Sequence, residues 1–186
     1  EHVRTLALEH GRAACSAQLL DPPWQHWVSA DGCAAIAYTV QGRTWIAGGA
    51  PLAATTEVAA VASAFARDAA RHGARVLWFL AEEPLRAAVG AGSWLRIGAQ
   101  PVFSPESLCR EFTRRSSLRQ QLRRTIGKLI TVRERRDDDD ATDDAFAQCH
   151  ARWRAGHHAP PLRLLAGGDE PSDLRDRRLF VARRDD

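Results

Sequence analysis

Three short apolar runs followed by one long helical pattern constrain the fold of this chain more than any other feature. The runs are separated by Asp-Gly and Gln-Gly turns and cover residues 24–28, 33–40 and 44–47. Runs of this length joined by short glycine-containing turns are typical of antiparallel strands. Residues 57–72 then carry apolar side chains at helical spacing and stop at Gly73, so we expect a helix packed on a three-stranded meander.

The other apolar runs predict further elements of both kinds. Residues 75–80 form a continuous apolar run, which is typical of a strand buried on both faces. The remaining pattern predicts helices over 1–11, 84–89 and 142–153, and extended segments over 94–103, 129–133 and 178–183. Mixed elements in this order indicate an α+β fold, with a mixed, largely antiparallel sheet and flanking helices.

Composition excludes several classes of protein. The chain has 186 residues, of which 45% are hydrophobic, and this is enough for one good core. No uninterrupted apolar run reaches the ~18–20 residues that span a bilayer. We therefore expect no integral membrane segment and a cytoplasmic location. The four cysteines lie far apart, which favours buried free thiols over a disulfide framework.

Positive charge is concentrated in one segment. Residues 110–136 hold ten Lys or Arg against two Glu, a local charge of +8 in a chain whose formal charge is +3. Four aspartates, Asp137 to Asp140, follow directly. A localised field of this kind selects partners by charge, so this segment is where a polyanion would bind.

Within this segment, a helix is predicted from Ser116 to Leu129. The serines at its start could act as N-caps, and Gly127 could end it in the left-handed conformation. Its apolar face consists of Leu118, Leu122, Ile126 and Leu129. The candidate residues for tRNA or phosphate binding are Arg115, Arg119, Arg123, Arg124 and Lys128. A solvated arginine face is the other reading of this pattern, and both stay open.

Other motifs give weaker signals. Gly48-Gly49 lies between a strand and a helix, but its spacing matches neither a P-loop nor a dinucleotide fingerprint. His150 and the pair at 157–158 form no complete tetrahedral set, so we predict no metal site and no cofactor. The six tryptophans are expected mostly in the core. No spacing predicts a catalytic residue.

The order of several motifs resembles a specific family. The relevant pieces are the Trp24–Pro51 strands with their Asp-Gly hairpin, Leu77-Trp78-Phe79, the helix Ser117-Leu118-Arg119-Gln120-Gln121-Leu122-Arg123-Arg124, Trp153 followed by Pro160-Pro161-Leu162, and the terminal Leu179-Phe180-Val181-Ala182-Arg183. Together they look like the C-terminal domain of the phosphatidylglycerol lysyltransferases. The Ser-Leu-Arg-Gln helix and the Pro-Pro turn are the most specific parts, and the resemblance covers essentially the whole chain.

This resemblance implies a fold and a function. The fold would be a tandem of GCN5-related acyltransferase-like domains, the first over residues 1–128 and a second, truncated one over 129–186. The function would be aminoacyl-tRNA-dependent transfer of an aminoacyl group to a lipid head group or another acceptor, incomplete in this chain. Aminoacyl-tRNA and an anionic phospholipid or membrane surface would be the partners, at the inner face of the membrane. An acyl-CoA-dependent N-acyltransferase and a non-catalytic polyanion-binding domain are the alternatives.

Overall fold

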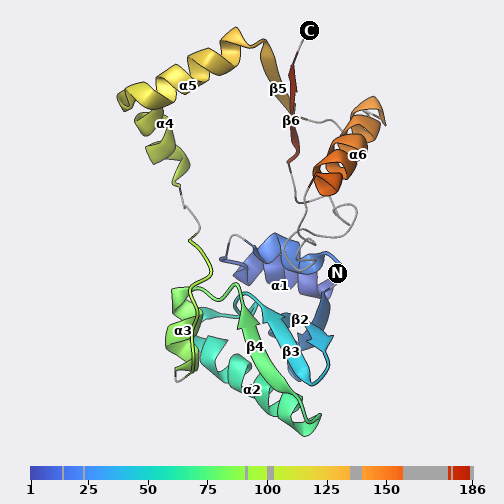
Figure 1. Cartoon of the computed structure of the whole chain (residues 1–186). Coiled ribbons are helices and arrows are strands. Elements are labelled where there is room, and N and C mark those ends of the chain that lie inside the picture. The colour runs from blue at the N-terminus through green and yellow to red at the C-terminus, as the bar shows by residue number, and fades with distance from the viewer. Residues whose placement is uncertain are drawn as a thin grey trace. The chain divides into compact units, whose positions relative to one another are not determined.

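The computed structural model describes residues 1–13, 15–22, 24–90, 92–99, 103–134, 140–156, 176 and 178–184. It contains two compact units, which are taken separately below (Figure 1). Unit 1 consists of residues 1–92 and 154–175, and unit 2 consists of residues 93–153 and 176–186. The boundary at residue 128, which the family resemblance implies between two acyltransferase-like domains, stays a prediction.

Unit 1 contains a four-stranded sheet in the order β1-β2-β3-β4. The strands are β1 (Gln25–Val28), β2 (Ala35–Gln41), β3 (Thr44–Gly48) and β4 (Arg75–Phe79). The first three pair antiparallel, which confirms the predicted meander, whereas β3 and β4 pair in parallel. Gly42 has a φ of 57° in the two-residue turn between β2 and β3, a conformation that glycine adopts without strain.

Helices cover both faces of this sheet. The helices α1 (His2–His10) and η1 (Ser16–Leu20) contribute buried leucines to one face, where they meet Ala35 and Ala37. The helix α2 (Val58–Arg71) follows the one-turn helix η2 (Thr55–Glu57) and covers the other face, and α3 (Glu83–Val89) follows β4 (Figure 1). The predicted helices at 1–11, 57–72 and 84–89 are therefore confirmed.

The core under α2 is an aromatic cluster centred on Phe65, which is fully buried. The Phe65 ring centroid lies 5.4–6.0 Å from those of four neighbours, which are Trp27, Tyr38, Trp45 and Trp78. These rings come from all four strands, so one side chain of α2 contacts the full width of the sheet. Trp24 is also buried, as predicted, but Trp153 is 46% exposed and is not a core residue.

The prediction for β4 was wrong in one respect. The strand β4 lies at the edge of the described sheet, and its residue Leu77 is 49% exposed. Val76 and Trp78 point toward the cluster under α2, so the intervening Leu77 lies on the opposite face of the strand. The continuous apolar run in the sequence therefore forms a strand that is buried mainly on one face.

Unit 2 contains three helices and a two-stranded sheet in its described part. The helices are α4 (Pro105–Arg114), α5 (Ser116–Gly127) and α6 (Asp140–Ala155), and the strands are β5 (Ile130–Glu134) and β6 (Phe180–Arg184). The predicted basic helix, the helix near 142–153 and the strands near 129–133 and 178–183 are confirmed. The last strand, β6, pairs antiparallel with the earlier strand β5.

Two further differences from the predictions concern the segment before α5. Residues 92–99 and 103 form no strand, although an extended segment was predicted over 94–103. The helix α4 was not predicted, yet its start carries clear signals, because the Ser104 hydroxyl accepts from the Ser107 amide and Pro105 occupies the first turn. The Pro160-Pro161-Leu162 turn lies outside the described residues.

An ion pair links the ends of β5 and β6, and it makes this pairing sensitive to acid. An Arg178 guanidinium nitrogen donates to Glu134 Oε2 at 2.6 Å, and this bond holds the pKa of Glu134 below its ordinary value. A depressed carboxyl pKa stabilises the folded state above the unfolded pKa, and that stabilisation is lost as pH falls through the folded pKa. We expect amide exchange in β6, corrected for intrinsic rates, to quicken as the pH falls below the ordinary pKa of a glutamate carboxyl. The R178Q variant should lack this acid-dependent step, and an identical step in that variant would contradict the prediction.

Candidate phosphate-binding site

All five predicted phosphate-binding residues lie on or beside α5, because the helix begins and ends close to the predicted positions. Arg115 is the N-cap residue, and no side chain caps the helix, so neither serine has the predicted capping role. The left-handed residue after the helix is Leu129, with a φ of 55°, and Gly127 is not among the residues with positive φ. The helix is therefore present as predicted, but its two ends are built differently.

Two of the five predicted residues, Arg115 and Arg119, form contacts with α4. Arg115 Nε pairs with the Glu111 carboxylate, and Arg119 Nη1 donates to the carbonyl oxygen of Thr113. The Arg115 amide also donates to the Glu111 carbonyl at 2.9 Å. These contacts hold the corner between the two helices, so they give Arg115 and Arg119 a structural role that the sequence prediction missed. The signal was the four-residue spacing of Glu111 and Arg115.

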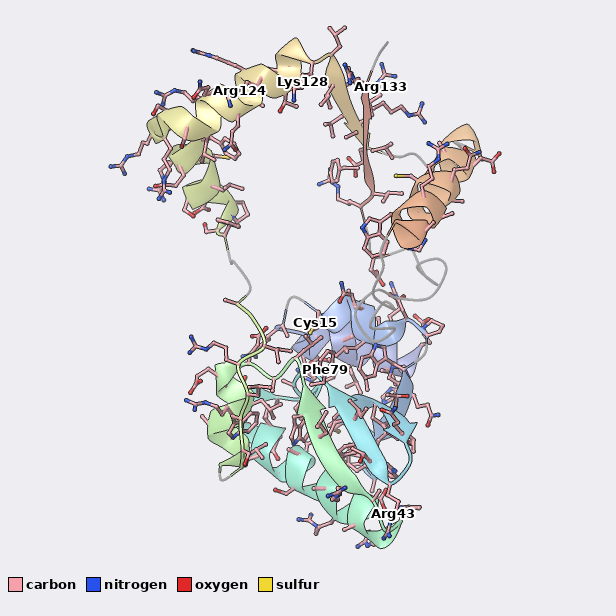
Figure 2. The ribbon with its side chains drawn as sticks, in the orientation of Figure 1. Cys15, Arg43, Phe79, Arg124, Lys128 and Arg133 are labelled. Carbon is pink, nitrogen blue, oxygen red and sulfur yellow. The ribbon has the colours of Figure 1, made fainter. Side chains whose placement is uncertain are left out.

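The other three residues are exposed, and no described side chain forms an ion pair with them. We call Arg123, Arg124 and Lys128 the cationic set. Figure 2 shows Arg124 and Lys128 along α5 and Arg133 on the adjoining strand β5. Side chains on one helix at such spacings can meet successive phosphates of an extended polyanion, and arginine offers a fork of donors to each. Part of the predicted site is therefore available for a ligand.

The apolar face of α5 is not buried within the described structure. Leu122, Ile126 and Leu129 are 52%, 63% and 61% exposed, while Leu118 is partly buried. Arg119 and Arg123 each follow an apolar residue by one position, about 100° around the helix, so the cationic side chains flank this stripe. The stability of α5 therefore owes little to the burial of these apolar side chains.

The Gly48-Gly49 turn does not present its amides to an anion. The Gly49 N–H donates to the carbonyl oxygen of Phe79 at 2.8 Å, which joins the ends of the parallel strands β3 and β4. Gly48 packs directly against Trp24 and Leu19. Both glycines therefore serve the fold, which agrees with a spacing that matches neither a P-loop nor a dinucleotide fingerprint.

The cysteines differ from the prediction of buried thiols. Cys15 is buried, and burial raises the pKa of its thiol, with the nearby Glu82 charge acting in the same direction. The other three, Cys33, Cys109 and Cys149, are exposed, and all four are free. Within the described residues, no group of three or more His, Cys, Asp or Glu side chains could hold a metal ion. His157 and His158 lie outside those residues.

No described helix combines the length with the apolar character that a bilayer-crossing segment requires.

Comparisons with known proteins give a consistent result. The sequence profile of the family described as "Phosphatidylglycerol lysyltransferase, C-terminal" matches residues 5–186. A crystal structure of the C-terminal domain of a protein assigned as a lysylphosphatidylglycerol synthetase, from Agrobacterium fabrum, is similar with a TM-score of 0.74 and 19% identity, and covers 99% of this chain and 59% of that one. The structure of L-PGS from Bacillus licheniformis is similar with a TM-score of 0.68 and 16% identity, over 98% and 58% of the two chains. No curated protein sequence matches the chain.

Proposed function

Because the chain belongs to the phosphatidylglycerol lysyltransferase C-terminal family, we propose that it forms part of an enzyme that transfers an aminoacyl group from aminoacyl-tRNA to a lipid head group. The observation that carries this proposal is the family match over residues 5–186, which includes both compact units. The chain spans less than two thirds of the two structural relatives, 59% and 58% of their lengths. Their similarity supports the acyltransferase-like α+β fold, and the activity is our inference from the family.

The proposed reaction moves an ester from one alcohol to another. A hydroxyl of the acceptor head group attacks the ester carbonyl at the 3′ end of the tRNA. A new bond forms between that carbonyl carbon and the acceptor oxygen, the bond to the ribose oxygen breaks, and the ribose hydroxyl leaves with a proton. Such a reaction needs a general base and donors for the developing oxyanion. We assign neither role to a residue of this chain.

We assign the cationic set to tRNA binding. Arg123, Arg124 and Lys128 are exposed on one helix, and the described residues place no carboxylate against them. Arg115 and Arg119 would support this surface indirectly, because they hold α5 against α4. Neutralising phosphates releases condensed counterions, so binding through this set should weaken steeply with salt.

The test compares two variants of equal charge. R123Q/R124Q should weaken tRNA binding about tenfold near 0.1 M salt and lower the log–log salt slope by about two, because each arginine neutralises about one phosphate. R115Q/R119Q removes the same charge from residues that already have protein partners, so its loss should be smaller. Fluorescence anisotropy with labelled tRNA over a series of salt concentrations would measure both.

Two results decide against parts of this proposal. Equal losses in the two variants would show that net charge alone governs binding and would overturn the assignment to Arg123 and Arg124. A longer form of the protein that binds lysyl-tRNA but produces no aminoacylated lipid would contradict the transfer reaction and favour a polyanion-binding domain. Thin-layer chromatography of radiolabelled lipid products would measure the second outcome.

A further inference from the structure

A second cluster of cations lies on unit 1, at the end of the sheet opposite Cys15 and Phe79. Figure 2 shows Arg43 at that end. Three segments bring the cluster together, and we call it the basic tip: Arg43 in the turn after β2, Arg71 and His72 at the end of α2, and Arg75 at the start of β4. All four residues are exposed. These residues belong to none of the motifs described above, and the proposed function gives them no role.

Backbone and side-chain hydrogen bonds fix the geometry of the basic tip. Arg43 Nε donates to the Gly73 carbonyl at 3.1 Å, and the Arg75 amide donates to the Arg43 carbonyl at 2.9 Å. Gly73 has a φ of 66°, which lets the chain turn from α2 into β4 within hydrogen-bonding reach of Arg43. The Arg43 side chain is therefore tied to the turn after α2, and the backbone of Arg75 lies beside it, although 31 positions separate residues 44 and 75, which pair there.

The imidazole is positioned as well. His72 Nδ1 lies 2.9 Å from the Asp68 carbonyl oxygen, and the His72 ring lies against Trp45 with centroids 5.3 Å apart. This leaves the Nε2 edge of His72 as the part of the ring that can meet a ligand. A side chain whose ring is already ordered loses less entropy when it binds a ligand.

Little negative charge lies near the basic tip, and hydrogen bonding occupies part of it. Asp68 is the carboxylate that the described contacts place here, and its Oδ2 accepts from Trp27 Nε1 at 3.0 Å. Its other oxygen lies 3.8 Å from Arg71, a loose and exposed pair that contributes little. Basic residues at a helix C-terminus stabilise the helix dipole, and this accounts for Arg71 and His72. It does not account for Arg43 and Arg75, which come from a turn and a strand.

We propose that the basic tip is a further RNA-backbone contact, which binds phosphates of tRNA. This inference rests on the proposed function, since aminoacyl-tRNA is the polyanion that function requires. Exposed guanidinium groups gathered at one end of a sheet suit phosphate oxygens, which accept their paired donors. Val40 and Leu77, 47% and 49% exposed, are the large exposed apolar side chains on the strands that meet at the tip, and this is too little apolar area to anchor the tip in lipid.

The test removes two cations from the basic tip and two from elsewhere on unit 1. R43Q/R75Q should weaken tRNA binding by about fivefold to tenfold near 0.1 M salt and lower the salt slope by about two. The control R12Q/R86Q removes the same charge from exposed residues on α3 and just after α1, and it should change affinity less than twofold. Arg86 pairs with Glu83 at 2.6 Å on the surface, so the control should fold normally. R43K/R75K keeps the charge and should restore most of the salt slope.

The outcomes separate this inference from the proposed function. If R43Q/R75Q binds tRNA like R12Q/R86Q, the basic tip is a solvated surface and the inference is overturned, whatever R123Q/R124Q does. A loss with R43Q/R75Q but none with R123Q/R124Q supports the tip and overturns the cationic set. A loss confined to vesicles of anionic lipid, with tRNA binding unchanged, also overturns the inference. Unchanged thermal unfolding of R43Q/R75Q would show that any loss arises from the removed charges.

Discussion

Phe65→Ala should destabilise unit 1 more than any other single truncation proposed for this chain. The side chain is 0% exposed and contacts aromatic rings from all four strands of the sheet. Its removal loses the transfer free energy of a phenyl ring and leaves a cavity that the rigid tryptophans cannot fill. We expect the free energy of unfolding to fall by about 3–5 kcal/mol. Urea denaturation followed by tryptophan fluorescence would measure this change.

Leu122→Ala is the matched control, because it also truncates a large apolar side chain on a helix. Leu122 is 52% exposed, so its truncation should cost less than about 1 kcal/mol. Similar losses in the two variants would mean that the apolar stripe of α5 is covered in solution, contrary to the described structure. A loss of less than 2 kcal/mol in Phe65→Ala would contradict the central role of the aromatic cluster.

Gly48→Ala should also destabilise unit 1, through crowding instead of a cavity. A Cβ atom at this position would lie 2.6 Å from Trp24 Cη2 and 2.7 Å from Leu19 Cδ2, both closer than real contacts allow. The two side chains are buried at 8% and 1% exposure, so neither can move without disturbing the core. We expect a loss of about 1–3 kcal/mol in the free energy of unfolding.

Gly98→Ala provides the control for this prediction. A Cβ atom there meets nothing within 4 Å, and the backbone φ does not lie in the left-handed region. Thermal unfolding monitored by circular dichroism should therefore leave Gly98→Ala close to the parent and shift Gly48→Ala to a lower Tm. An unshifted Gly48→Ala would show that Trp24 and Leu19 can move apart at little cost.

The sequence predicted unit 1 well because its signals are local. Each signal depends on only a few neighbouring residues. The short apolar runs form strands, Gly42 lies in a two-residue turn, and α2 ends next to Gly73, all as expected. The edge position of β4 was missed, because an apolar run looks the same whether one or both faces of its strand are covered. Leu77 shows the difference only in three dimensions.

The helix that carries the candidate site was predicted, but its contacts were not, and phosphate binding by its residues stays a prediction. Charge counts cannot show which cations already have protein partners. Arg115 and Arg119 bind Glu111 and Thr113 through a helix, α4, that was not predicted. The basic tip could not be found from spacing at all, because Arg43 and Arg75 meet only after α2 has brought β4 beside β3.

The parallel pairing of β3 with β4 has a consequence for how the sheet assembles. Each antiparallel pair closes a loop of only a few residues, while the β3–β4 pair closes a loop that contains the whole of α2. The entropy lost on closing a loop grows with its length, and parallel strands need a crossover connection of a dozen or more residues. We therefore expect the meander of β1, β2 and β3 to form from local contacts and β4 to join it later.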